Sequence, residues 1–308
     1  SFAYLGRALI GAGAAFSFVG ALNMAARWFP SKFAILGGWA QMMGSAGGFI
    51  GQAPLGIAVA TVGWRLSSVV LGVVGLCLAF LLAFTVRDPT KIKSQKKSPI
   101  WNGLKAVAVN RQTWLATISA GGLTGTLLAF GGLWGVPYLM VAKGISKPES
   151  AGFVSMAFIG WAIGAPLMGW LSDFLGKRRL ILIVGSAGAC LTTITLLVFP
   201  NMPNILLVSV LGIQGALSSS MILGFALARE SNPPEMSGAA LGLINTFAVG
   251  SGAILQPLAG YILDLQWDST IIDGVRIYDV VHYQYALSIL PIACVFSLSA
   301  AILLKEKH

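Results

Sequence analysis

The residues whose order suggests chemistry most clearly form a short charged stretch between two apolar runs. Asp173 is followed by Gly176 and then by the three consecutive cations Lys177, Arg178 and Arg179. Glycine can supply the positive φ of a tight reversal, so the stretch predicts a loop that joins two helices. The order of the carboxylate, the glycine and the cations is more specific than a cluster of charges alone. The alternative is an ordinary cytoplasmic loop that follows the positive-inside rule.

Polar side chains within the apolar runs are the second group that could do chemistry, by binding a solute. Arg7 lies in the first run, where an arginine is costly unless it faces water or a partner, although it could also snorkel to the membrane surface. Hydrogen bonding between helices, or a place in an aromatic belt, is the alternative for the others. Those other candidates are Gln41, Thr124, Trp134, Tyr138, Gln214, Ser218 and Asn245.

The sequence has no pattern typical of an enzyme. Its two histidines, His282 and His308, lie at a loop junction and at the last position, so no triad or metal cluster can be assembled from them. There is no Gly-x-x-x-x-Gly-Lys loop for ATP, and the three cysteines lie in apolar runs without a Cys-x-x-Cys pair. We therefore expect no enzymatic activity, no metal and no cofactor.

The elements that position these residues are membrane helices. Hydrophobic residues make up 56% of the chain and charged residues only 10%, against about 25% charged in soluble domains. Runs of about 20 apolar residues mark bilayer-spanning helices. We predict nine of them, at residues 2–26, 34–60, 65–86, 113–140, 150–171, 180–199, 204–228, 237–263 and 283–304.

The distribution of cations sets the orientation of these helices. If the loop at 169–180 is cytoplasmic, fifteen lysines and arginines fall on the cytoplasmic side and four on the outer side. The C-terminus is then cytoplasmic, and the net charge of +10 reflects topology, so we expect no nucleic-acid partner. We interpret the basic segment 87–112 as a linker between two helical bundles on the cytoplasmic face of the membrane. It could also touch anionic lipid headgroups.

An internal repeat divides the chain. A shift of 203 residues places Pro30 on Pro233, Gly47 on Gly250, Pro54 on Pro257, Leu55 on Leu258 and Trp64 on Trp267. The shift also overlays predicted helices 2–26 and 34–60 on 204–228 and 237–263. We therefore expect a partial N-terminal bundle of three helices at 1–86, the linker at 87–112, and a six-helix C-terminal bundle at 113–308. The first half would then lack counterparts of three helices; a true nine-helix protein is the alternative.

The charged stretch resembles the Gly-x-Leu-Ala-Asp-Arg-x-Gly-Arg-Lys loop of the major facilitator superfamily of transporters. The matching residues are Gly169, Leu171, Asp173, Gly176, Lys177 and Arg178, and the sequence departs at Phe174, where the family usually has Arg. Arg7, Gly11 and Gly13 are similar to a pattern on the fourth helix of that family. The resemblance implies an all-α integral membrane protein of the MFS fold, of which this chain looks like helices four to twelve of twelve.

The resemblance also implies a function. The chain would be a secondary transporter that moves a small organic solute, a metabolite or an organic anion, by alternating access around a midplane site. We expect a monomer in a bacterial inner membrane. Proton coupling stays open, because no carboxylate lies mid-membrane; Asp264, at the outer end of the eighth predicted helix, is the nearest. The alternatives are a solute sensor of the same fold that does not transport, and a facilitative uniporter or exchanger.

Overall fold

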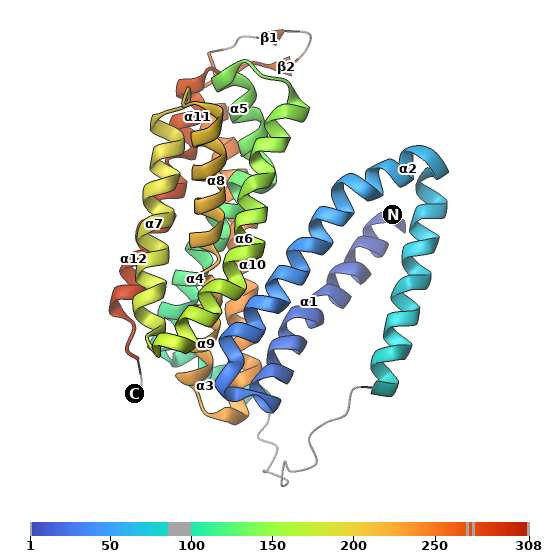
Figure 1. The fold of residues 1–308 in the computed structure, drawn as a ribbon, viewed down its shortest axis with the longest axis vertical. Coiled ribbons are helices and arrows are strands. Elements are labelled where there is room, and N and C mark those ends of the chain that lie inside the picture. The colour runs from blue at the N-terminus through green and yellow to red at the C-terminus, as the bar shows by residue number, and fades with distance from the viewer. Residues whose placement is uncertain (1, 86–99, 269–270, 273–274, 307–308) are drawn as a thin grey trace. The chain divides into compact units, whose positions relative to one another are not determined.

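The computed structural model describes residues 2–85, 100–268, 271–272 and 275–306, and within these it leaves the side chains of 2–4, 7–8, 14–15, 48–57, 60, 102, 271–272 and 275 undescribed. The described chain is helical apart from one short hairpin (Figure 1). Its helices are α1 (Phe2–Trp28), α2 (Phe33–Thr85), α3 (Ile100–Val109), α4 (Arg111–Ala129), α5 (Gly135–Lys143), α6 (Lys147–Leu175), α7 (Arg178–Val198), α8 (Asn204–Ser218), α9 (Met221–Glu230), α10 (Ser237–Leu265), α11 (Val280–Leu287) and α12 (Ile289–Leu303).

Short turns and a hairpin join these helices. The 3-10 turns η1 (Pro30–Lys32) and η3 (Pro234–Met236) precede α2 and α10, and the π turn η2 (Phe130–Trp134) joins α4 to α5. Strands β1 (Ile271–Ile272) and β2 (Val275–Arg276) pair antiparallel between α10 and α11, with Ile271 opposite Arg276. The hairpin is the one departure from an all-helical chain among the described residues.

The predicted membrane helices are confirmed as helical segments. Eight segments of the described chain are long and apolar enough to cross a bilayer. The predicted spans 34–60 and 65–86 form the single helix α2, which breaks at Gly63 with φ 82° and ψ 158°. Only glycine adopts that φ without strain, so Gly63 separates the two predicted spans as a turn would.

Three of the predicted spans are interrupted. Span 113–140 contains η2, in which the Gly135 N–H donates to the Phe130 carbonyl five residues back. The widened turn lies just before Pro137, whose ring cannot be accommodated in a regular preceding turn. Span 204–228 breaks between α8 and α9 at Ser219 and Ser220, and span 283–304 breaks at Ser288.

The described chain forms two compact units, residues 1–42 with 99–308, and residues 43–98. The smaller unit contains most of α2 with its break at Gly63. The division into bundles at 1–86 and 113–308 stays a prediction.

In the larger unit the C-terminal helices form one bundle. Helix α4 packs against α10 and α12, α6 packs against α8, and α7 packs against α8 and α12. The last turn of α12 lies at the same end of this bundle as α3 and α9, and the β1–β2 hairpin lies at the opposite end (Figure 1). We call these the basic end and the hairpin end.

Small residues allow the closest helix packing in that bundle. A Cβ on Gly215 of α8 would lie 2.9 Å from the Trp161 backbone N of α6, and one on Gly164 would lie 2.5 Å from the Ala216 Cα. Glycines therefore bring the α6 and α8 backbones into contact, as is common between membrane helices.

Candidate functional site

The charged loop predicted from the sequence lies where α6 ends and α7 begins. Gly176 caps α6 in the left-handed region with φ 62°, as expected from the sequence. Asp173, in the last turn of α6, accepts a hydrogen bond on Oδ2 from the Ile35 N–H at 3.2 Å. Ile35 lies in the first turn of α2, where backbone N–H groups have no partner within the helix and favour an anion. The Asp173 carboxylate thus docks the start of α2.

Arg178 opens α7 and connects this carboxylate to two further acidic residues. A guanidinium Nη lies 3.3 Å from Asp173 Oδ1, and its Nε lies 3.1 Å from Glu230 Oε1 at the end of α9. The Arg178 backbone N–H donates to Glu306 Oε1 at 2.6 Å. The side chains of Asp173 and Arg178 are only 16% and 15% exposed, so water screens their ion pair less than it screens a surface pair.

Arg229 makes the second set of contacts at the same end. Its guanidinium donates to the Ala26 carbonyl at 3.2 Å and to the Pro30 carbonyl at 3.4 Å. It also lies over the Phe33 ring, 4.9 Å from the ring centroid. A cation at the C-terminal carbonyls of α1 satisfies groups that the helix cannot satisfy itself. Arg229 therefore fixes the α1–α2 turn on α9.

Glycines let the backbones approach at this contact. A Cβ on Gly169 of α6 would lie 2.7 Å from the Ala34 carbonyl carbon and 2.9 Å from the Ile35 Cα. A Cβ on Gly38 of α2 would lie 2.6 Å from the Pro166 Cα. The start of α2 and the end of α6 thus touch along their backbones, with charged groups at the rim. We call this set of contacts the α2–α6 contact.

Two residues of the predicted loop stay outside the α2–α6 contact. Lys177 is exposed and carries none of these bonds. Phe174, which stands where the related family usually has Arg, is 72% exposed and stacks on Trp170 with ring centroids 5.5 Å apart. At this position an aromatic pair therefore replaces a cation.

Several residues of the contact were not predicted. Glu230, Arg229 and Glu306 lie 57, 56 and 133 positions after Asp173 in the chain, and only the fold brings them to it. A charged pair at the end of an otherwise apolar run, as at 229–230, is the signal that could have pointed to them.

The predicted solute-binding residues of the C-terminal bundle separate into two groups. The first is polar and buried: Thr124 on α4, and Gln214 and Ser218 on α8. The atoms Thr124 Oγ1, Gln214 Oε1 and Ser218 Oγ are buried without a hydrogen-bond partner among the described residues, as is Ser220 Oγ at the α8–α9 break. Buried polar atoms normally have partners, so these atoms are among the few in the described bundle interior that are left without one.

The second group is aromatic. Trp134 donates from Nε1 to the Gln256 carbonyl at 2.9 Å, and the Tyr138 hydroxyl donates to the Leu196 carbonyl at 2.9 Å. Tyr138 is fully buried and lies 6.2 Å from both Phe130 and Tyr283, measured between ring centroids. In this structure both predicted side chains belong to an aromatic cluster inside the bundle, and their polar atoms bond to helix carbonyls.

The remaining candidates lie on other helices. Gln41 on α2 and Asn245 on α10 are half-buried. Arg7 lies on α1, and its side chain is outside the described residues. Gln41 and Asn245 are therefore not as fully buried as Thr124, Gln214 and Ser218.

Asp264 lies at the hairpin end. It pairs with Arg276 at 2.7 Å and accepts a hydrogen bond from the Tyr278 hydroxyl at 2.5 Å. Partial burial and this bond raise the pKa of Tyr278 above its usual range, and the same carboxylate raises the pKa of Arg276. Asp264 is thus already bound to a cation, which makes it a poor proton carrier in this arrangement.

In the described part of the chain, no three His, Cys, Asp or Glu side chains are grouped so that they could hold a metal ion.

Comparison with known proteins identifies the family to which the chain is similar. The Major Facilitator Superfamily sequence model matches residues 1–152 and 125–307. The chain is 27% identical over 303 residues to a Bacillus subtilis protein named probable galactarate/D-glucarate transporter GudP, covering 84% of this chain and 63% of that protein. It is 25% identical over 259 residues to the membrane sensor protein UhpC of Escherichia coli, covering 75% of this chain and 58% of that protein. The chain thus spans about three fifths of the length of these relatives.

The fold has relatives among solved structures. The fucose transporter FucP in its outward conformation superimposes with a TM-score of 0.70 at 12% identity, covering 94% of this chain and 72% of that chain. At this identity the likeness concerns the fold alone.

Proposed function

The chain belongs to the Major Facilitator Superfamily, and we propose that it works as a secondary transporter that carries a small organic anion by alternating access. The observation that carries the proposal is the α2–α6 contact. It combines ion pairs, one hydrogen bond to a helix N-terminus and backbone contact at glycines. All of these interactions are non-covalent, so they can form and break together, as a gate requires.

Burial along α1 supports a gate at the basic end. Leu22 and Ala26, near the C-terminal end of α1, are buried, whereas Leu9, Ile10 and Phe16 are exposed. Phe18 packs edge-on against Phe225 of α9, with ring centroids 5.5 Å apart. Helix α1 therefore packs on the C-terminal bundle through one end, which fits a state closed at that end.

The solute class follows from relatives and residues together. GudP, the relative with the widest coverage reported above, is named for two dicarboxylic sugar acids. Arg7 on α1 would neutralise a carboxylate, and the buried oxygens of Thr124, Gln214 and Ser218 would take hydroxyl groups or their waters. We propose a sugar-acid type of organic anion as the solute, with proton coupling as an open part of the proposal.

Location and topology complete the proposal. The basic end would face the cytoplasm, with the C-terminus, in a bacterial inner membrane, and the protein would act as a monomer without enzymatic activity. The excess of cations in the loops of one side supports this orientation.

Uptake into proteoliposomes tests the function. The panel would hold labelled galactarate, D-glucarate, a neutral sugar and an amino acid, with and without an inward proton gradient. We expect saturable uptake of the sugar acids, exceeding that of the neutral sugar. Uptake that rises with the gradient would establish a proton symporter, and uptake indifferent to it a uniporter or exchanger. Equal, non-saturable entry of all four compounds would contradict the proposal.

A sensor is the second candidate, because UhpC is named a membrane sensor protein and matches three quarters of this chain. The same vesicles distinguish the two functions. Saturable binding of one solute without counterflow would favour the sensor, whereas counterflow of labelled solute against an unlabelled excess would exclude it.

A further inference from the structure

An apolar groove opens on the C-terminal bundle between α4, α10 and α12. Its volume is about 380 Å³, and its walls carry Ile118, Phe247, Ile254 and Phe296. These four side chains are between 44% and 65% exposed, on helices that are apolar enough to cross a bilayer. The groove is thus open at the surface of the described bundle and lined by groups that favour a hydrocarbon chain.

The groove has a defined depth. Trp114 and Gly122 of α4 line it, about 5 Å and 17 Å along the helix axis from Arg111 at 1.5 Å per residue. Half the hydrocarbon thickness of a bilayer is about 15 Å. The groove therefore occupies the depth of one leaflet, beginning close to the basic end.

Two exposed cations lie where that leaflet's headgroups would be. Arg111 is one turn before Trp114, and the Lys305 N–H donates to Gln112 Oε1 at 2.8 Å, which holds Lys305 beside the start of α4. Both side chains are exposed, and neither is in an ion pair within the described residues. A cation at the first position of a helix is electrostatically unfavourable, so helix stability does not explain Arg111.

Helix α3 adds a membrane-surface element beside these cations. It buries Val107 against the bundle but exposes Trp101, Leu104 and Val109 by 77%, 37% and 83%. It is tied to the groove because the Trp114 Nε1 donates to the Ala108 carbonyl at 2.6 Å. An exposed apolar face that includes Trp is typical of a helix lying in the headgroup region.

We propose that this groove is a binding site for one anionic glycerophospholipid of the cytoplasmic leaflet. One acyl chain would lie along Ile118 and Phe247, and the phosphate would lie at Arg111 and Lys305, beneath α3. The site is separate from the α2–α6 contact and does not depend on transport.

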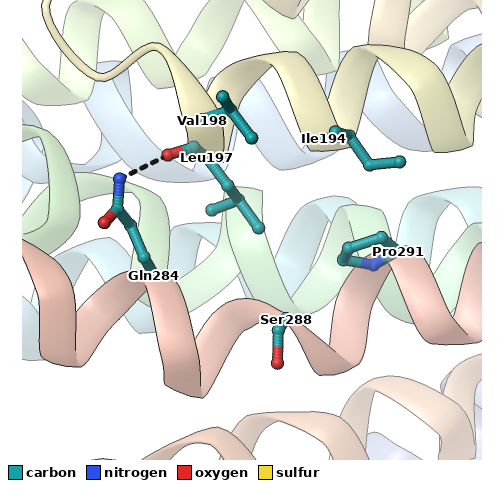
Figure 2. Close-up of a pocket in the computed structure, with 6 residues that line it drawn as sticks. All are labelled: Ile194, Leu197, Val198, Gln284, Ser288 and Pro291. Atoms are coloured by element: carbon teal, nitrogen blue, oxygen red, sulfur yellow. Dashed lines mark hydrogen bonds between the residues drawn. The ribbon is translucent and has the colours of Figure 1, made fainter.

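A second groove provides a contrast. It measures about 410 Å³ and lies between the end of α7 and the α11–α12 break, lined by Ile194, Leu197, Val198, Gln284, Ser288 and Pro291 (Figure 2). Gln284 donates to the Leu197 carbonyl at 2.7 Å, and, as in the first groove, no cation is among the lining residues. The two grooves are similar in volume, but Arg111 and Lys305 lie at the start of α4, beside the first groove only.

Native mass spectrometry tests the proposal, with the purified protein titrated with phosphatidylglycerol or phosphatidylcholine of equal chain length. We expect one phosphatidylglycerol to be retained in preference to phosphatidylcholine. The double variant Arg111→Gln/Lys305→Gln should bind phosphatidylglycerol about 25-fold more weakly, about fivefold per cation, and phosphatidylcholine as before. Equal retention of the two lipids by the unaltered protein would overturn the proposal.

Two pairs of variants separate the groove from general effects. Ile118→Trp fills the proposed site and should weaken binding of both lipids. Ile194→Trp fills the second groove and should leave phosphatidylglycerol binding unchanged. The two isoleucines are a matched pair, because Ile118 is 44% exposed and Ile194 is 41% exposed. Lys147→Gln, an exposed cation in the first turn of α6, should also change nothing. An equal loss of binding in Ile194→Trp or Lys147→Gln would contradict a site in this groove.

Discussion

Arg178 is the side chain on which the charged part of the α2–α6 contact depends most. It lies between the carboxylates of Asp173 and Glu230, and no other cation is ion-paired to either of them in the described chain. Removing one partner of a buried ion pair leaves the other charges uncompensated, which costs more than the pair itself contributes. The contact should therefore be more sensitive to Arg178 than to any neighbouring cation.

Arg178→Gln is expected to destabilise the protein by about 2 kcal/mol, because a hydrogen bond to a charged group contributes about 1.5–3 kcal/mol. Lys177→Gln, one position earlier and exposed, should be neutral. Thermal unfolding in detergent measures both. Matching unfolding midpoints for the two variants would remove the structural role of Arg178.

Arg7 is a second side chain with a proposed role, which is to bind the solute and not to hold the α2–α6 contact. If its charge neutralises a carboxylate, Arg7→Ala should weaken binding more than Arg7→Lys, which keeps the cation. Isothermal titration with the transported anion gives both affinities. Affinities equal to that of the unaltered protein in both variants would leave Arg7 as a residue that snorkels to the membrane surface.

At the scale of helices, the sequence predicted the spans but not their interruptions. Spans are long apolar runs, so composition alone reveals them. The break at Ser219 and Ser220 and the π turn at Phe130 lie inside such runs, where nothing in the local hydropathy changes. Pro137 explains the π turn that precedes it, whereas nothing in the local sequence marks the break at Ser219 and Ser220. The Gly176 reversal was predictable, because it depends on one residue's own φ.

The candidate site likewise has residues that the sequence predicts and residues that it does not. The loop residues Asp173, Gly176 and Arg178 are close in sequence and form a recognisable pattern. Glu230 and Glu306 reach Arg178 only through folding, and the burial of Tyr138 depends on α7 and α11. A single sequence does not show which distant segments meet, although the charged pair at 229–230 marks one candidate.

Two glycines of α6 provide a matched test of the backbone contact. A Cβ on Gly169 would overlap the start of α2, whereas one on Gly152 has nothing within 4 Å. Gly169→Ala should weaken the α2–α6 contact and lower the rate of solute uptake at least tenfold. Gly152→Ala should leave uptake unchanged and stabilise the helix by up to about 1 kcal/mol. Initial uptake rates of both variants measure this, and wild-type rates for Gly169→Ala would contradict the close approach.

The π turn offers a second matched pair of glycines. A Cβ on Gly135 would lie 2.7 Å from the Phe130 carbonyl O and 2.9 Å from its ring, whereas one on Gly132 would meet only the end of the Gln256 side chain at 3.4 Å. Gly135→Ala should therefore lower the midpoint of thermal unfolding, and Gly132→Ala should change it little. Equal midpoints would indicate that the π turn rearranges around the added methyl group without loss of stability.

At the scale of the whole molecule, the proposed carrier is in one of two states. The α2–α6 contact would close the basic end, and transport would require it to open so that solute is released on that side. A solute shifts such an equilibrium only by the difference in its affinity for the two states. The contact should thus be populated without solute and redistributed by it.

The distance between α2 and α6 at the basic end tests this most directly. Spin labels at Lys32→Cys and Leu175→Cys, both exposed and adjacent to the Ile35–Asp173 hydrogen bond, would be placed in a background without Cys77, Cys190 and Cys294. Electron–electron double resonance on the reconstituted protein should give a short distance without solute. It should give a second, longer population when the transported anion is added. A single short distance that no solute changes, in vesicles that still take up the anion, would contradict a gate at the α2–α6 contact.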